Sequence, residues 1–263
     1  MTLTEVQHSM SEFLDRLRGG EQCLVLAIRS SRTADVVRVA KSTGHDAVLI
    51  DLEHSVMSLD VAAALAATAS DLGLFPFVRL PEAEYGAIGR LLDCGAGGIV
   101  APRIQTPGQA ATVARACRFP PHGQRSQLAT VPPFGMRPTP AAELNPALDD
   151  ATVVQILIET PDGVSRADEI AAVDGVDMLA FGANDFTAEI GAPGQYGDPR
   201  VTEAVAALAS ACKRHGKLLM VGGIGDPARL RELDALGVCP LRLTGTDTDM
   251  LYAGAAARAE RFL

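Results

Sequence analysis

Short apolar runs alternate with longer amphipathic segments along the chain, and eight such runs can be distinguished. Each run is almost continuously hydrophobic instead of alternating between apolar and polar positions. This is typical of strands in a parallel sheet whose two faces are both buried. The predicted strands cover residues 23–28, 47–51, 75–80, 98–102, 152–159, 178–182, 218–222 and 240–244.

The segments between the runs repeat their apolar positions with the period of an α-helix. Two of them begin with threonine followed by proline, Thr106-Pro107 and Thr160-Pro161. The hydroxyl can cap such a helix, and proline suits its first turn. The predicted helices cover residues 33–43, 59–72, 82–94, 107–117, 161–173, 202–215 and 227–236.

Eight strand–helix units with short connections favour a closed (β/α)8 barrel, the TIM barrel, over an open doubly wound sheet. No linker or internal repeat interrupts the pattern, so residues 1–263 are expected to form a single domain. Residues 119–150, which follow the fourth predicted helix, interrupt the alternation of strands and helices. They hold seven prolines, and their apolar positions show no regular period. Such a segment can be a lid, a binding element or an interface, or a surface excursion without a role.

The N-terminal residues 1–20 are polar and acidic, and they predict an amphipathic helix with Val6, Met10, Phe13 and Leu17 on one side. They lack the apolar core of a signal peptide, and no stretch of the chain reaches the length needed to span a bilayer. The five cysteines are odd in number and show no paired spacing. We therefore expect reduced thiols in a cytoplasmic protein.

The formal net charge of −9 argues against a nucleic-acid partner, which requires a basic face to neutralise phosphates. An anionic small molecule would need a local cluster of arginines or a metal ion. The carboxyl ends of barrel strands carry the active site in this fold. Acidic residues follow the second, fifth and sixth predicted strands, and arginines follow the first, third and fourth, so these charges are expected to converge on a binding site.

Glu159 and Asp185 are the sharpest pair, because each follows an apolar strand and the two strands are consecutive. Two carboxylates at one rim repel each other unless one is protonated or a cation lies between them. An oxygen-liganded ion such as Mg²⁺ or Mn²⁺ fits such a pair and completes its shell with water and substrate oxygens. The alternative is that Asp185 caps a helix and Glu159 forms a salt bridge.

Three further residues at or near these strands could take part in chemistry. His54 follows Asp51 and Glu53, and a histidine beside carboxylates can transfer protons near neutral pH, unless it is only a structural histidine. Arg79 can grip a carboxylate or stabilise an enolate, or it can simply pair with Glu53 or Asp51. Asp93 ends the helix before the fourth strand, where by itself it would be a surface acid.

Seven segments in the correct order resemble the HpcH/HpaI class II (metal-dependent) pyruvate aldolases. The resemblance extends over nearly the whole chain, from about Cys23 to Leu263. The segments are DAVLIDLEH at 46–54, FVR at 77–79, LLDCG at 91–95, RFPPHGQR at 118–125, IET at 158–160, FGAND at 181–185 and GTD at 245–247.

This resemblance implies that Glu159 and Asp185 bind Mg²⁺, Mn²⁺ or Co²⁺, which chelates pyruvate or another 2-oxo acid. It implies that Arg79 stabilises the enolate and that His54 transfers protons, paired with Asp93 of a neighbouring subunit. The substrate is expected to contact Gly182, Ala183, Asn184 and Arg79.

The resemblance also implies a homo-oligomer, a trimer of dimers, in which the final helix at about 248–262 is exchanged between subunits. The expected reaction is reversible aldol cleavage of a 4-hydroxy-2-oxo acid to pyruvate and an aldehyde. A metal and Arg79 would stabilise the pyruvate enolate without a Schiff-base lysine, and no lysine follows a predicted strand.

The chain departs from the family pattern near the expected substrate mouth. Leu157 stands where these aldolases usually carry glutamine, Ser126-Gln127-Leu128 replaces a glycine-rich turn, and the proline-rich residues 130–146 are unlike the common sequence. These changes leave the acceptor aldehyde open. The alternatives are a synthase or decarboxylase that uses oxaloacetate, like the citrate-forming and macrophomate synthases of the family, and a catalytically silent barrel that binds a carboxylate.

Overall fold

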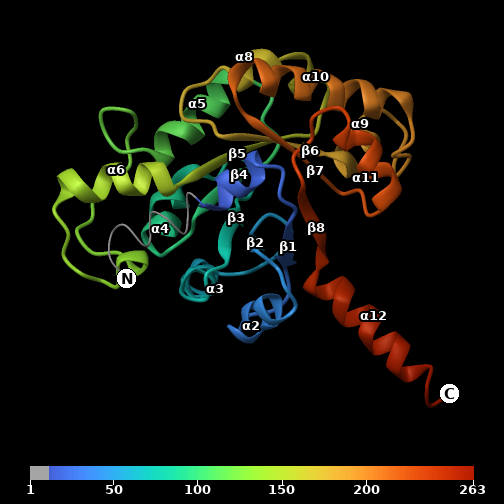
Figure 1. Ribbon diagram of the computed structural model, residues 1–263, viewed down its shortest axis with the longest axis horizontal. Helices are drawn as coiled ribbons and strands as arrows, with labels where there is room; N and C mark the ends of the chain where they lie inside the picture. The colour runs from blue at the N-terminus through green and yellow to red at the C-terminus, as the bar shows by residue number, and fades with distance from the viewer. Residues whose placement is uncertain (1–11) are drawn as a thin grey trace.

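Eight parallel strands form a nearly closed barrel in the computed structural model, which describes residues 12–263 (Figure 1). Neighbouring strands follow the order β7-β6-β5-β4-β3-β2-β1-β8. The Cys239 amide donates to the Leu219 carbonyl at 2.7 Å, which links the first and last strands of this order. The strands are β1 (Cys23–Ile28), β2 (Ala47–Asp51), β3 (Phe75–Arg79), β4 (Gly98–Ala101), β5 (Val153–Ile158), β6 (Met178–Gly182), β7 (Leu218–Gly222) and β8 (Leu241–Thr246).

The predicted TIM-barrel fold is confirmed, and every predicted strand coincides with an observed one to within two residues at each end. This agreement has a physical reason. A barrel strand packs against the barrel interior on one face and against the surrounding helices on the other. It is therefore apolar throughout, which distinguishes its sequence from that of the amphipathic helices.

Helices surround the barrel, and several of their ends are set by side chains. Thr106 and Thr160 cap α5 and α7 as predicted, through their hydroxyls. The helix predicted over residues 161–173 is divided in two at Arg166. The helices are α2 (Asp35–Ser42), α3 (Leu59–Asp71), α4 (Ile88–Asp93), α5 (Pro107–Cys117), α6 (Ala141–Ala151), α7 (Pro161–Ser165), α8 (Ala167–Ala171), α9 (Ala183–Glu189), α10 (Pro199–His215), α11 (Pro227–Asp234) and α12 (Asp247–Ala259), with 3-10 turns at Tyr85–Ala87 and Pro132–Phe134.

The prediction that residues 119–150 lack regular structure is wrong for their last third, which forms α6. Pro146 lies inside this helix, where it removes one backbone hydrogen bond. Packing compensates for that loss. Leu144, Ala147 and Leu148 are buried against Phe119, Val131 and Phe134 in a small core of their own.

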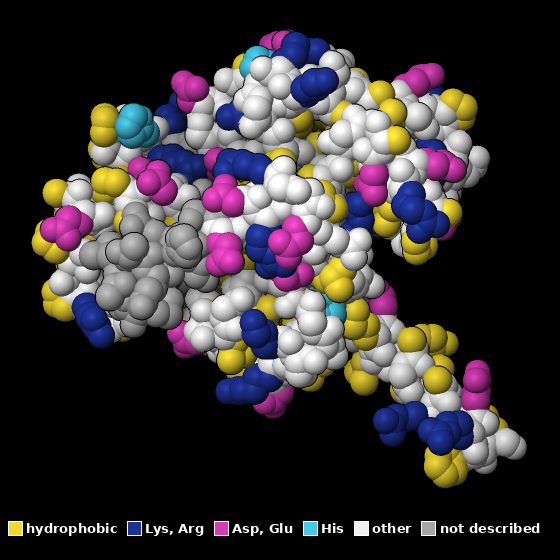
Figure 2. Space-filling model, in the orientation of Figure 1, with side chains coloured by type: hydrophobic (Ala, Val, Ile, Leu, Met, Phe, Trp, Pro, Cys, Tyr) yellow, Lys and Arg dark blue, Asp and Glu magenta, His cyan; other side chains and the backbone are white. Residues whose placement is uncertain are grey.

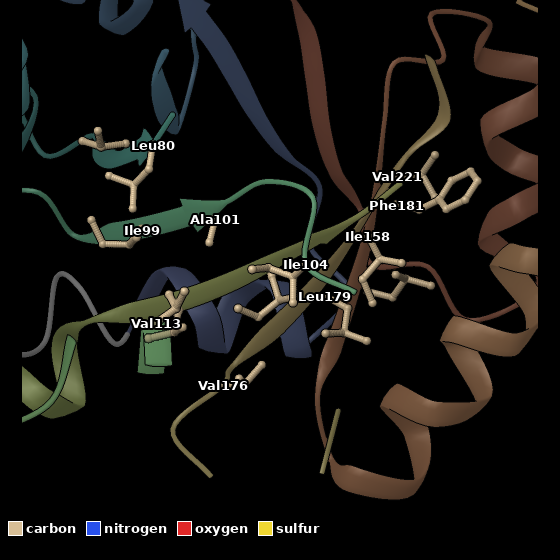
Figure 3. Packing of buried hydrophobic residues seen from close by; sticks show 14 of the residues in the cluster. Leu80, Ile99, Ala101, Ile104, Val113, Ile158, Val176, Leu179, Phe181 and Val221 are labelled. Carbon is tan, nitrogen blue, oxygen red and sulfur yellow. The ribbon is translucent and has the colours of Figure 1, made fainter. Parts of the chain in front are cut away.

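The main core fills the space between the barrel and its helices, and Figure 3 shows part of it around Ile99, Ile158 and Phe181. A second core lies inside the barrel and is closed at the amino ends of the strands by a helical stretch at residues 12–18. Phe13 of this stretch stacks on Phe75 at a centroid distance of 4.5 Å. Phe13 and Leu17 are buried as predicted, whereas Val6 and Met10 lie outside the described residues. This stretch closes only the amino end of the barrel, so the carboxyl end remains open to a functional site.

The C-terminal helix α12 projects away from the barrel (Figure 1). It carries large apolar side chains into solvent, and Leu251 and Tyr252 are 73% and 77% exposed. No helix within residues 12–263 is long and apolar enough to cross a membrane. All five cysteines are free thiols.

Candidate active site

Glu159 and Asp185 lie side by side at the carboxyl end of the barrel. Glu159 follows β5 directly, Asp185 is in the first turn of α9 after β6, and the two strands are paired at Ile158 and Phe181. Asp185 does not cap α9, since the cap residue is Gly182. Neither carboxylate forms a salt bridge with any residue in the range 12–263, and Glu159 Oε1 accepts a hydrogen bond from the Arg103 amide at 2.9 Å. The alternative roles, a helix cap for Asp185 and a salt bridge for Glu159, therefore have no support in the contacts of this pair.

Burial, and then the nearby charge of Asp185, raise the pKa of Glu159 to about 7. The side chain is 3% exposed. The Arg103 amide offsets part of this shift, because it donates to the ionised form. Arg103 has a φ of 52°, in the left-handed region, and this backbone turn aims its N–H at Glu159.

The raised pKa of Glu159 makes the stability of the metal-free protein depend on pH. A carboxyl group whose folded pKa lies above its unfolded value stabilises the fold at low pH and loses that contribution as pH rises through about 7. In EDTA, the unfolding free energy of Glu159→Gln relative to that of the wild type should therefore increase by up to roughly 3 kcal/mol as the pH rises from 5 to 8. Urea unfolding of both proteins across this range measures the difference, and a gap that shrinks with pH would contradict the assignment.

Arg79 and Asp51 form a bidentate ion pair beside these carboxylates. Arg79 Nε and Nη2 donate to the two Asp51 oxygens at 3.0 and 2.7 Å, and Arg79 Nη1 lies 3.2 Å from Glu53 Oε2. Burial by itself would raise the pKa of Asp51, which is 1% exposed, but Arg79 holds that pKa below its usual range. The structure thus shows the ion pairs that the sequence left as an alternative for Arg79. It also places this guanidinium on the wall of the cavity.

His54 is half exposed at the cavity, and its Nε2 lies 3.7 Å from Glu53 Oε2. Asp93 is not part of this cavity. It ends α4, near the amino ends of the strands, where its carboxylate accepts from Arg125 Nη2 at 2.8 Å. Arg125 is buried and stacks over the Phe119 ring at 4.6 Å. Within one chain, the structure therefore brings His54, but not Asp93, to the carboxylate pair.

A cavity of about 410 Å³ opens between these groups at the mouth of the barrel. Gly182, Ala183 and Asn184 line it beside Asp185, together with Arg29 from the opposite rim. A side chain at position 182 would have its Cβ 2.6 Å from Glu159 Oε2, so glycine is required there for the carboxylate to keep its place. The cavity continues into the barrel as far as Leu49, Val100, Gln155 and Leu157.

The sequence pattern did not reveal every polar residue at this site, and Gln155 and Tyr196 are among those it missed. Gln155 lies on the same face of β5 as Leu157 and Glu159, and its Nε2 is buried without a hydrogen-bond partner among the described residues. The period of two along the strand could have revealed it. Tyr196 donates its hydroxyl to Asn184 Oδ1 at 2.6 Å, and no local pattern marks a residue that arrives from a loop.

The residues present fit a divalent cation that takes only two ligands from the protein. Glu159 and Asp185 supply hard oxygen donors, and Mg²⁺ and Mn²⁺ commonly take one or two carboxylates and complete their shell with water and substrate. No group of three or more His, Cys, Asp or Glu side chains within residues 12–263 forms a closed metal site. An ion here would keep open positions for a ligand.

The family model described as HpcH/HpaI aldolase/citrate lyase matches residues 27–232. The chain belongs to this family. It is 39% identical over 220 residues to the 4-hydroxy-4-methyl-2-oxoglutarate aldolase tasA of Hapsidospora irregularis, covering 83% of this chain and 82% of that one. It is 32% identical over 197 residues to the 2-keto-3-deoxy-L-rhamnonate aldolase of Escherichia coli O1:K1 / APEC, covering 73% and 72%.

Solved structures of HpcH/HpaI proteins have the same fold. The HpcH/HpaI aldolase from Desulfitobacterium hafniense DCB-2 superposes with a TM-score of 0.87 at 26% identity, covering 95% of both chains. The citrate synthase SbnG superposes with a TM-score of 0.82 at 26% identity, covering 94% of this chain and 95% of that one. The family resemblance predicted from the sequence is confirmed, and the protein is an aldolase-type carbon–carbon lyase.

Proposed function

We propose that this lyase cleaves a 4-hydroxy-2-oxo acid reversibly to pyruvate and an aldehyde, with Mg²⁺, Mn²⁺ or Co²⁺ held by Glu159 and Asp185. The observation that carries the proposal is the buried Glu159 carboxyl beside Asp185 on the wall of a cavity, with no cationic side chain from residues 12–263 bound to either carboxylate. The names of the two aldolase relatives support it, because both substrates are 2-oxo acids.

When bound, the cation would supply positive charge for the carboxylate and 2-oxo oxygens of the substrate and for the enolate left after cleavage. Arg79 would add a second positive charge to that enolate from the wall of the cavity, with its orientation set by Asp51. Gly182, Ala183 and Asn184 would position the 2-oxo acid beside the cation. No lysine among the described residues lines the cavity, which disfavours an imine mechanism.

Proton transfer is assigned to His54, which reaches the cavity from β2. We propose that Asp93 of a neighbouring subunit pairs with it, as the sequence resemblance implies. Arg125 would then act as the group that holds Asp93 in place, since it donates to this carboxylate. In this arrangement a complete site requires two subunits.

We further propose a trimer of dimers in which α12 is exchanged between subunits. The exposed apolar side chains of this C-terminal segment support the proposal, because Leu251 and Tyr252 on the helix and Phe262 just after it gain no stabilisation from burial while they lie in water (Figure 2). The single domain over residues 1–263 and the cytoplasmic location stay predictions.

Deleting residues 250–263 should convert the hexamer into smaller species, because it removes the exposed apolar face of α12. The deletion keeps Asp247, which binds the loop after β1, and Asp249, which completes the cap of the helix. Light scattering after gel filtration gives the mass of both proteins. A truncated protein with the mass of the full-length assembly would rule out this role of α12.

Incubating the protein with pyruvate, a panel of aldehydes and each of the three cations tests the function. Metal-dependent aldol product is the expected result, and EDTA should abolish it.

The structural likeness to SbnG and the presence of Leu157 beside Glu159 favour one second candidate, an oxaloacetate-using synthase or decarboxylase. Turnover of oxaloacetate alone would select it. Absence of both turnover and metal binding would leave only a carboxylate-binding barrel.

A further inference from the structure

Arg29 lies on the rim of the cavity opposite the carboxylate pair. It follows β1, whereas Glu159 and Asp185 follow β5 and β6, and β2, β3 and β4 lie between these strands in the barrel. The same residue also lines an open hollow that adjoins the cavity, together with Arg32, Glu53, Ser55 and Val56. Arg29 therefore stands where a reactant entering from solvent would pass toward the carboxylate pair.

The Arg29 guanidinium is held in a fixed position at one nitrogen. Its Nε donates to Asp51 Oδ2 at 3.2 Å, and Asp51 is itself buried and paired with Arg79. The register places these three residues in a row across adjacent strands, with Asp51 directly opposite Arg79. The backbone of Arg29 is held as well, since its amide donates to Asp247 Oδ1 at 2.9 Å.

The two terminal nitrogens of Arg29 donate to no group within residues 12–263, although the side chain is only 38% exposed. A guanidinium with one fixed nitrogen and two free ones presents a planar fork, which matches the two oxygens of a carboxylate. Arg32 differs, because its Nη1 donates to the Arg29 and Ser31 carbonyls, and it lines the hollow without reaching the cavity.

We propose that Arg29 binds a carboxylate on the carbonyl compound that accepts the enolate. The inference rests on the proposed function, in which the pyruvate half occupies the rim at β5 and β6. The acceptor must then approach from the other side, where the free fork of Arg29 lies. The acceptor class is a 2-oxo acid or an aldehyde with a carboxylate next to the carbonyl, and the cleaved substrate is a 4-hydroxy-2-oxo diacid.

The test compares two acceptors of similar size, glyoxylate and glycolaldehyde, with pyruvate as donor and Mn²⁺ present. The measured quantity is the ratio of their kcat/KM values, in which any loss of folded enzyme cancels. Arg29→Gln should lower the glyoxylate preference at least about tenfold, the scale of a lost charge-assisted hydrogen bond. Arg29→Lys should recover part of it, and the control Arg32→Gln should keep the wild-type ratio.

An unchanged ratio in Arg29→Gln, or an equal fall in Arg32→Gln, would overturn the proposal. A separate measurement distinguishes failure of the Arg29 proposal from failure of the proposed function. Exchange of the pyruvate C3 protons with D₂O reports enolate formation without any acceptor. Exchange in the wild type with an insensitive ratio refutes only the role of Arg29, whereas absence of metal-dependent exchange refutes the enolate chemistry and this inference with it.

Discussion

Glu159→Gln is expected to abolish divalent-cation binding and to lower kcat for aldol cleavage by about 10³ or more. The substitution keeps the shape of the side chain and its contact with the Arg103 amide, but removes the negative charge that the cation would require. Loss of a Lewis acid that contributes several kcal/mol to transition-state stabilisation corresponds to a factor of this size. Calorimetric titration with Mn²⁺ and steady-state kinetics give the two quantities.

A matched control for this variant is Glu232→Gln on α11, which neutralises an exposed carboxylate away from the cavity. It should bind Mn²⁺ and turn over like the wild type. Full activity of Glu159→Gln in the presence of EDTA would refute the assigned site. Activity lost with Mn²⁺ binding retained would move Glu159 from the metal to another catalytic role.

Arg79→Lys is expected to lower kcat by about 10² to 10³, with a smaller change in KM for the 2-oxo acid. Lysine preserves a positive charge beside Asp51, so the buried carboxylate keeps a counter-charge and the fold should survive. It loses the fork that contacts Asp51 and Glu53 and aims the group at the cavity. The removal of one preorganised charge from a developing anion has an effect of this order.

Arg242→Lys on β8 provides the comparison, because Arg242 is also a partly buried strand arginine paired with an aspartate, Asp234. It does not line the cavity, so its kcat should match the wild type. If Arg79→Lys also keeps the wild-type kcat, the arginine serves only to neutralise Asp51 and Glu53. Thermal unfolding of both variants separates loss of turnover from loss of structure.

The local sequence pattern predicted the barrel because its strands and helices obey different spacing rules. A strand buried on both faces is apolar throughout, and the polar residue that follows it marks the carboxyl end of the barrel. Glu159 and Arg79 were found in this way, and pairing of adjacent strands then placed Glu159 near Asp185. The helix α6 was missed because Pro146 opposes it locally and only packing against Phe119 and Phe134 stabilises it.

Individual contacts depend on groups that are distant in the sequence, and no spacing rule contains them. The raised pKa of Glu159 follows from its burial and from the nearby charge of Asp185, against the opposing effect of the Arg103 amide. The fixed position of the Arg29 guanidinium follows from the buried Asp51. Asp93 pairs with Arg125, which lies in the segment 119–150, where the apolar positions show no helical or strand period.

The sequence by itself determined the fold, the family resemblance and the charged residues at the barrel mouth, because each depends on short-range order along the chain. Only the tertiary structure decided which of those charges are already paired and which remain available. Arg79 is occupied by Asp51 and Glu53, while Asp185 has no partner within residues 12–263 and Arg29 keeps two free nitrogens there. Such pairing depends on distances of a few ångströms between different strands, and closure of the barrel sets those distances.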